Sequence, residues 1–290
     1  MEPDERTYTA GDGTELPMRV WPPPEKVPGT FFARPAALVC LHGIQSHSGW
    51  YEASSRRLAE AGVAVYQIER RGSGRDARHE RGHVDKAETW LEDVARAAEL
   101  ARDETGAGSV HLMGISWGGK LAMACAAHRP DLYRSLILSA PGIVPVVDVV
   151  LLMKVRIAKC LMMGEALRRF PIPIDDPHLF TANPDRVRYI AEDELSLRDL
   201  TARFMYESRR LDRMVRAAAA TVRVPTLLLL AERDRIINNE ATRALIYSMA
   251  ARKRVITYPG AHHTLEFELD PQPYFKDLVA WIDQVEGESP

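Results

Sequence analysis

Short apolar runs alternate with longer amphipathic stretches along most of the chain. The run 36–42 is apolar at almost every position, as expected for a strand buried on both faces of a sheet. An alternation of such strands with helices predicts a mostly parallel sheet with helices on both faces. Further strands are predicted over 8–10, 18–21, 63–68, 110–113, 136–139, 226–230 and 255–258, and helices over 54–61, 87–104, 117–128, 242–250 and 274–285.

The beginning of the chain has a different pattern. The first two predicted strands, 8–10 and 18–21, flank Gly11-Asp12-Gly13, a turn sequence typical of a hairpin. The proline-rich stretch 21–29 follows, and we expect it to form a surface loop.

One long stretch, 142–223, interrupts the alternation. It contains no strand-like run bounded by turns, only helical periodicity, with prolines at positions 171, 173, 177 and 184. An insertion of this length between two core strands predicts a helical cap over 143–222, with 1–142 and 223–290 forming the core domain. Apolar residues between positions 146 and 161 recur at helical spacing, and we expect this stripe to pack on the core domain.

Charge and cysteine content narrow the class of protein. The formal net charge of −2 produces no field that favours nucleic acid, so no nucleic-acid partner is expected. Cys40, Cys125 and Cys160 show neither a metal-ligand spacing nor a disulfide framework. The first residues contain no apolar signal core, and the longest apolar run, 143–153, is too short and too charged to span a bilayer. We therefore expect a cytoplasmic protein without a transmembrane segment.

The most informative motif is Gly114-Ile115-Ser116-Trp117-Gly118, between a predicted strand and an alanine-rich predicted helix. Glycines on both sides of the serine permit a sharp strand-to-helix turn that lifts the Ser116 hydroxyl above the sheet. The free amides and dipole of the helix N-terminus then favour a developing anion. Ser116 is therefore the predicted nucleophile, since an ordinary N-cap serine would not need both glycines.

A serine nucleophile needs an imidazole to take its proton and a carboxylate to orient that imidazole. Both should lie in loops beyond the carboxyl ends of later strands. Asp234 follows the predicted strand 226–230, with Glu232 as a weaker candidate nearer the strand end. His262 and His263 follow the predicted strand 255–258, and spacing alone leaves both open as the base.

Together these segments resemble α/β-hydrolases of the monoacylglycerol lipase and lysophospholipase type, often described as serine aminopeptidase-like hydrolases. The resemblance implies the α/β-hydrolase fold with a helical cap inserted after strand six. The family's Gly-Ala-x-His pattern implies that His263 is the base, and its Asp-Arg pair implies that Asp234 is the partner. The matching segments are His42-Gly43, His47-Ser48-Gly49-Trp50-Tyr51, Arg71-Gly72-Ser73-Gly74, the Ser116 motif, 225–230, Asp234-Arg235-Ile236 and Gly260-Ala261-His262-His263.

The segment 38–44 resembles the strand and loop that supply the first donor of the oxyanion hole in this fold. The resemblance implies that the backbone amides of Ile44 and Trp117 hold the oxyanion. His42 is expected to hold the loop by hydrogen bonds and not to act as a base.

The chain departs from the family pattern at three positions. Glu69 stands where the family usually has Asp, Asp76 where it often has Ser, and Trp117 where it commonly has Met. We expect the Trp117 side chain to contact substrate and to narrow the floor of the acyl pocket. Arg70 and Arg71 are expected to be solvated near the mouth of the site, where one could contact a polar head group.

The resemblance implies a serine hydrolase that cleaves a carboxylic ester through an acyl-enzyme on Ser116, with no cofactor and no metal. The expected small-molecule partner is a monoacylglycerol- or lysophospholipid-type acyl ester, and transient contact of the cap with a lipid surface is also expected. One alternative is an esterase or amidase for a small or specialised-metabolite substrate. Another is a non-catalytic ligand-binding protein with the same fold.

Overall fold

The computed structural model describes residues 1–24 and 35–288. Among these residues, eight strands form one sheet in the order β1-β2-β4-β3-β5-β6-β9-β10. β1 and β2 form an antiparallel hairpin, β2 is antiparallel to β4, and every other pair in the sheet is parallel. The predicted fold class, a mostly parallel sheet, is therefore confirmed. The strands are β1 (Asp4–Thr9), β2 (Glu15–Trp21), β3 (Ala36–Leu41), β4 (Val63–Ile68), β5 (Val110–Ile115), β6 (Tyr133–Ser139), β9 (Thr226–Ala231) and β10 (Lys253–Tyr258).

The central strands are continuously apolar because both of their faces are covered. Every residue of β3, β4, β5 and β9 is buried, whereas β10, at the edge of the sheet, is only half-buried. Of the predicted surface loop 21–29, residue 21 ends β2, and 25–29 lie outside the described residues.

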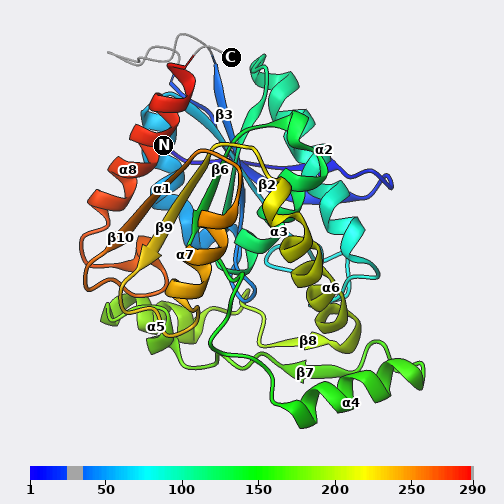
Figure 1. The fold of residues 1–290 in the computed structure, drawn as a ribbon. Coiled ribbons are helices and arrows are strands. Elements are labelled where there is room, and N and C mark those ends of the chain that lie inside the picture. Colours follow the sequence, from blue (N-terminus) through cyan, green and yellow to red (C-terminus); the bar gives the residue numbers. More distant parts are fainter. Residues whose placement is uncertain (25–34, 289–290) are drawn as a thin grey trace.

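Helices cover both faces of the sheet (Figure 1). α1 (Glu52–Glu60) and α8 (Gln272–Glu286) pack together on one face, and α2 (Ala87–Thr105) and α3 (Trp117–His128) pack together on the other. α7 (Asn239–Ser248) contacts β9 and β10. α3 is buried from Trp117 to Ala126 because β5, β6 and α6 (Ala202–Ala218) enclose it, which explains why its sequence is apolar all round.

The inserted segment between β6 and β9 lies largely at one end of the sheet (Figure 1). It contains α4 (Leu151–Met162), α5 (Pro184–Glu192) and α6, and also an antiparallel pair formed by β7 (Arg169–Pro171) and β8 (Asp199–Thr201). The expectation that this segment has helical structure alone is wrong in that respect. Strands of three residues are too short to produce a periodic signal. The division into a core domain and a cap at 143–222 remains a prediction.

The apolar stripe of α4 does not pack on the core as expected. Its buried residue, Ile157, belongs to a small separate cluster with Phe170 and Ala202, because α4 packs on α6. Its other side is open: Leu151 and Leu152 are 76% and 71% exposed. Among the described residues, none of the helices combines the length and the apolar character that a membrane span requires.

Candidate active site

Ser116 lies at the sharp turn between β5 and α3. Its backbone has φ 52° and ψ −122°, which is uncommon for a residue with a side chain. A Cβ atom at Gly114 would lie 2.3 Å from the Gly118 carbonyl oxygen, and one at Gly118 would lie 2.3 Å from the Leu41 carbonyl oxygen. Because neither Cβ has space, glycine is required at both positions, and the turn presents the Ser116 hydroxyl beyond the end of β5.

Two short hydrogen bonds join three side chains that are far apart in the sequence. The Ser116 Oγ lies 2.8 Å from His263 Nε2, and His263 Nδ1 lies 2.7 Å from Asp234 Oδ2. The other carboxylate oxygen of Asp234 accepts hydrogen bonds from the Ile236 and Ile237 amides, at 2.8 and 3.1 Å. These amides fix the carboxylate, which accepts the Nδ1 proton and leaves Nε2 free to accept a proton from the hydroxyl.

The two weaker candidates face other partners. His262 Nδ1 lies 3.1 Å from a carboxylate oxygen of Glu268, and Glu232 accepts a hydrogen bond from the Gly260 amide. The structure therefore brings the three predicted catalytic side chains together and leaves these two outside. The catalytic roles themselves remain predictions.

The inserted segment adds a side chain that sequence reasoning missed. The ring of Phe180 packs edge-on against the His263 imidazole, with 5.8 Å between ring centroids. The Thr264 amide donates a 2.8 Å hydrogen bond to the Phe180 carbonyl oxygen, which ties the two segments together. Phe180 lies in an irregular segment, so no periodicity marked it as part of a site.

The predicted oxyanion loop adjoins the nucleophile. A Cβ atom at Gly43 would lie 3.3 Å from the Ser116 Cβ, and the Gly43 amide donates to the Ser46 hydroxyl. The amides of Ile44 and Trp117 have no hydrogen-bond acceptor within the described residues, and both residues line one cavity with Ser116. Two backbone donors are thus available beside the hydroxyl, as an oxyanion hole requires.

His42 holds this loop by hydrogen bonds, as expected. Its Nε2 accepts a hydrogen bond from the Arg70 amide, so its Nδ1 donates to the Gly43 carbonyl oxygen at 2.8 Å. Desolvation by burial, followed by the nearby Arg70 cation, holds the pKa of His42 well below its usual value. The His42 ring is therefore neutral, and the hydrogen bonds of its two nitrogens hold the loop in place.

The expectation that Arg70 and Arg71 are solvated is wrong, because both side chains are buried. Arg71 donates to both carboxylate oxygens of Asp93, at 2.7 and 2.8 Å. Arg70 donates to backbone carbonyl oxygens of the oxyanion loop and stacks over Trp117. Neither guanidinium is therefore available to a head group at the mouth of the site.

The departures at Glu69 and Asp76 belong to the same buried loop. Glu69 accepts a 2.6 Å hydrogen bond from the Ser48 hydroxyl, and burial raises the pKa of its carboxyl group. Asp76 accepts a 2.8 Å hydrogen bond from the Gly72 amide. Both carboxyl groups therefore hold the loop that supports the site, away from the cavity beside Ser116.

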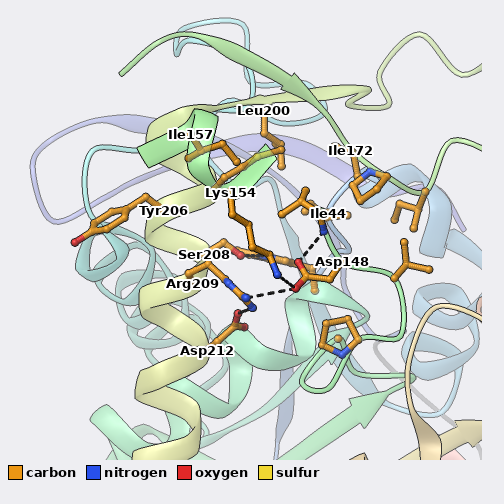
Figure 2. Close-up of a pocket in the computed structure, with 18 of the residues that line it drawn as sticks. Ile44, Asp148, Lys154, Ile157, Ile172, Leu200, Tyr206, Ser208, Arg209 and Asp212 are labelled. Atoms are coloured by element: carbon orange, nitrogen blue, oxygen red, sulfur yellow. Dashed lines mark hydrogen bonds and ion pairs between the residues drawn. The ribbon is translucent and has the colours of Figure 1, made fainter. Parts of the chain in front are cut away.

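A cavity of about 300 Å³ opens beside Ser116 and is lined mostly by residues of the inserted segment. One part of its wall is apolar and comes from several elements, and another part carries charged side chains (Figure 2). The apolar lining includes Ile44, Val147, Ile157, Leu161, Ile172, Ile174, Leu200, Met205 and Ile236.

The charged side chains of this wall are paired with one another. Asp148 lies between Lys154 and Arg209, at 2.6 and 3.3 Å (Figure 2). Lys120 lies 2.6 Å from Asp212, and Arg209 lies 3.4 Å from the same carboxylate. These pairs connect α3 and α6 to the chain that enters α4.

Trp117 is one of the residues that line the cavity. Its indole nitrogen donates a 2.9 Å hydrogen bond to the Ser208 hydroxyl of α6. Its ring packs against Trp90 and Phe204, with centroids 4.9 and 5.5 Å away. The ring is therefore held in place beside the nucleophile, and its contact with substrate remains a prediction.

Known proteins resemble this chain along most of its length. A family described as Serine aminopeptidase, S33, matches residues 33–270. The chain belongs to this family. Within the S33 family, the predicted α/β-hydrolase fold and the predicted class of enzyme, a carboxylic ester hydrolase, are confirmed.

Individual relatives agree with this assignment. The chain is 26% identical to a monoacylglycerol lipase of Mycolicibacterium smegmatis, over 96% of each chain. It is 27% identical to the monoglyceride lipase of Homo sapiens, over 94% of this chain and 88% of that protein. The crystal structure of Paleococcus ferrophilus monoacylglycerol lipase has the same fold, with a TM-score of 0.81, 23% identity and coverage of 94% and 100%.

A buried carboxyl group anchors the segment that follows His263. Glu266 accepts a 3.0 Å hydrogen bond from the Ser54 amide at the start of α1, and its other oxygen is bonded to the Ser54 hydroxyl. Desolvation by burial raises the pKa of Glu266 to about 7, and the bonds to Ser54 oppose this rise. In the folded protein this carboxyl group therefore stays neutral to a higher pH than an ordinary glutamate does.

Because the folded pKa exceeds the ordinary value of 4.5, Glu266 costs stability as pH rises. The contribution of protonated Glu266 to the free energy of unfolding is fully present below pH 4.5 and is lost as the pH rises through about 7. Glu266→Gln cannot ionise, so its free energy of unfolding should rise relative to wild type by about 3 kcal/mol between pH 4.5 and 8. Urea unfolding at several pH values checks this, and a difference that does not change with pH contradicts it.

Proposed function

We propose that this S33 family member hydrolyses a carboxylic ester through an acyl-enzyme on Ser116, with His263 as general base and Asp234 as its partner. The observation that carries the proposal is the pair of hydrogen bonds, 2.8 and 2.7 Å long, that joins these side chains. Nε2 of His263 takes the hydroxyl proton as Ser116 Oγ attacks the ester carbonyl carbon.

The remaining steps use the same groups. The Ile44 and Trp117 amides hold the oxyanion of the tetrahedral intermediate, and His263 returns its proton to the leaving alcohol. Water then loses a proton to His263 and attacks the acyl carbon, which releases the acid and restores the Ser116 hydroxyl. His263 gives the proton taken from water to the departing Ser116 oxygen, so each half of the cycle removes one proton and returns one.

We propose a monoacylglycerol- or lysophospholipid-type ester as substrate. The apolar part of the 300 Å³ cavity suits a medium or long acyl chain, and burying each methylene contributes about 0.8 kcal/mol. The names of the relatives, monoacylglycerol and monoglyceride lipase, support the same substrate class. A small or specialised-metabolite ester or amide is the competing substrate.

The charged wall argues against a peptide with a free amino terminus. An aminopeptidase needs an acidic group for the α-ammonium of its substrate. Among the described residues that line the cavity, the two carboxylates are Asp148 and Asp212, and each already pairs with cations of the protein. An ester with an apolar acyl chain fits this lining better.

Ser116→Ala should lower kcat for p-nitrophenyl esters by about 10⁶-fold and abolish labelling by a fluorophosphonate, because it removes the nucleophile. Ser248→Ala, the same change at an exposed serine, should retain both properties. Hydrolysis and labelling that survive in Ser116→Ala would refute the mechanism. Absence of labelling in the wild type would favour the non-catalytic alternative.

The acyl pocket can be tested by narrowing it. Leu161 is half-buried and lines the cavity, so Leu161→Trp should lower kcat/KM for p-nitrophenyl decanoate by at least about tenfold and leave p-nitrophenyl acetate nearly unchanged. Leu167→Trp, in the same segment but 57% exposed, is the matched control. A wild-type enzyme that prefers acetate would instead support a small substrate, and equal losses on both esters would contradict an acyl pocket at Leu161.

We further propose that the outer face of α4 contacts the lipid surface that holds the substrate. Leu151, Leu152 and Val155 of α4, and Val150 at its N-cap, expose apolar side chains there, with exposures from 57% to 76%. A contiguous exposed apolar patch on a helix is typical of a membrane or partner contact.

The double variant Leu151→Ser/Leu152→Ser should weaken binding to phosphatidylcholine vesicles by at least about tenfold, because two leucines lose their burial in lipid. Hydrolysis of monomeric p-nitrophenyl butyrate should be retained, since these residues lie outside the cavity lining. Tyr247→Ser, an exposed position on α7, serves as the control. Unchanged vesicle sedimentation of the double variant would refute the contact.

A further inference from the structure

Arg70 is a buried cation directly behind the predicted oxyanion loop. It follows the end of β4, and only 7% of the residue is exposed. Its Nη1 donates a 3.0 Å hydrogen bond to the Gly43 carbonyl oxygen, and its Nη2 donates a 2.9 Å bond to the Ile44 carbonyl oxygen. One guanidinium thus binds two successive peptide groups of the loop, which a lysine ammonium would match poorly.

The geometry of the peptide group connects this contact to the oxyanion hole. The Gly43 carbonyl and the Ile44 N–H belong to the same peptide group, which is planar and trans, so they point in opposite directions. Arg70 and His42 both donate to the carbonyl from one side. The Ile44 N–H therefore points to the other side, where Ile44 lines the cavity with Ser116.

The same guanidinium contacts the residue that carries the second amide. The central carbon of Arg70 lies 4.7 Å from the ring centroid of Trp117, a cation–π distance. The indole nitrogen also donates a hydrogen bond to the Ser208 hydroxyl, which holds the ring in place. Arg70 is therefore in contact with both residues whose amides are proposed to hold the oxyanion.

A charged donor behind a peptide group also changes its electronic character. Desolvation by burial lowers the pKa of Arg70 to about 9, so the guanidinium is protonated at neutral pH. A hydrogen bond from a cation to a carbonyl oxygen polarises the amide and makes its N–H a stronger donor. Burying this charge is costly, and the nearby Glu69 carboxyl group offsets part of that cost. The Nε of Arg70 has no hydrogen-bond partner among the described residues.

We propose that Arg70 is a positioning residue for the oxyanion hole, which fixes and polarises the 43–44 peptide whose N–H receives the developing negative charge. This inference rests on the proposed function, because it assumes a tetrahedral intermediate at Ser116. Its effect belongs to the transition state and not to substrate binding.

Arg70→Met and Arg70→Lys test this role against p-nitrophenyl butyrate. Loss of an oxyanion donor itself lowers kcat by about 10²–10³-fold, so loss of its support should lower kcat by about 10–100-fold, with less change for Lys than for Met. KM should change by less than about threefold. Thermal melting of each variant establishes that it is folded.

An oxyanion mimic separates positioning from a general structural role. An alkyl trifluoromethyl ketone accepts Ser116 Oγ at its carbonyl carbon, and its oxygen becomes the oxyanion while His263 holds the proton. Its Ki should rise in proportion to the loss of kcat across the Arg70 series. The Ki of the methyl ketone with the same alkyl chain, which binds unreacted, should not change. Arg71→Lys, at the equally buried neighbour that bonds to Asp93, should keep both kcat and Ki.

The outcomes distinguish this inference from the proposed function. A wild type that is neither labelled by a fluorophosphonate nor inhibited by the trifluoromethyl ketone refutes the proposed function. A wild type with both properties, and Arg70 variants that keep kcat and Ki or change only KM, overturns the role of Arg70 alone. If Arg70→Met does not fold, Arg70→Lys decides: matched changes in kcat and Ki support the role, and unchanged values overturn it.

Discussion

The site depends on a packing constraint at the turn between β5 and α3. The backbone there approaches Leu41 of β3 so closely that no Cβ fits at Gly118, and the neighbouring helix turn leaves none at Gly114. This close approach holds Ser116 at a positive φ and presents its hydroxyl at the end of the sheet. The Asp234 and His263 loops follow β9 and β10, whose carboxyl ends lie at the same edge, so the three side chains meet there.

Buried polar groups hold the loops around this turn. His42 and Arg70 bind the carbonyl oxygens of the oxyanion loop, and Glu266 anchors the segment after His263 to α1. Such groups are costly to bury unless their hydrogen bonds are made, so they favour one arrangement of each loop. The predicted catalytic groups lie in these loops, and the buried polar groups hold the loops in place through their hydrogen bonds.

The sheet and the predicted catalytic residues could be read from the sequence because their signals are local. Continuously apolar runs such as β4 and β9 match the structure within one residue, and α3 matches its predicted bounds. The two histidines could not be separated by spacing, and the family pattern was needed to choose His263. In the structure His262 bonds to Glu268, six residues later, and the spacing of the two histidines gives no sign of this contact.

What could not be predicted depends on contacts distant in sequence. The pairing of β7 with β8 joins two runs of three residues, and α4 exposes its apolar face because α6 offers only a small cluster for packing. Arg70 looks like a surface residue beside Arg71, and its burial depends on carbonyl oxygens 26 and 27 residues earlier.

The most direct test of the central claim is to trap the acyl group on the enzyme. Rapid acid quench during turnover of p-nitrophenyl decanoate, followed by proteolysis and mass spectrometry, locates the covalent intermediate. The account predicts a decanoyl group on the peptide that contains Ser116. Turnover with a decanoyl group on another residue, and none on Ser116, would contradict it.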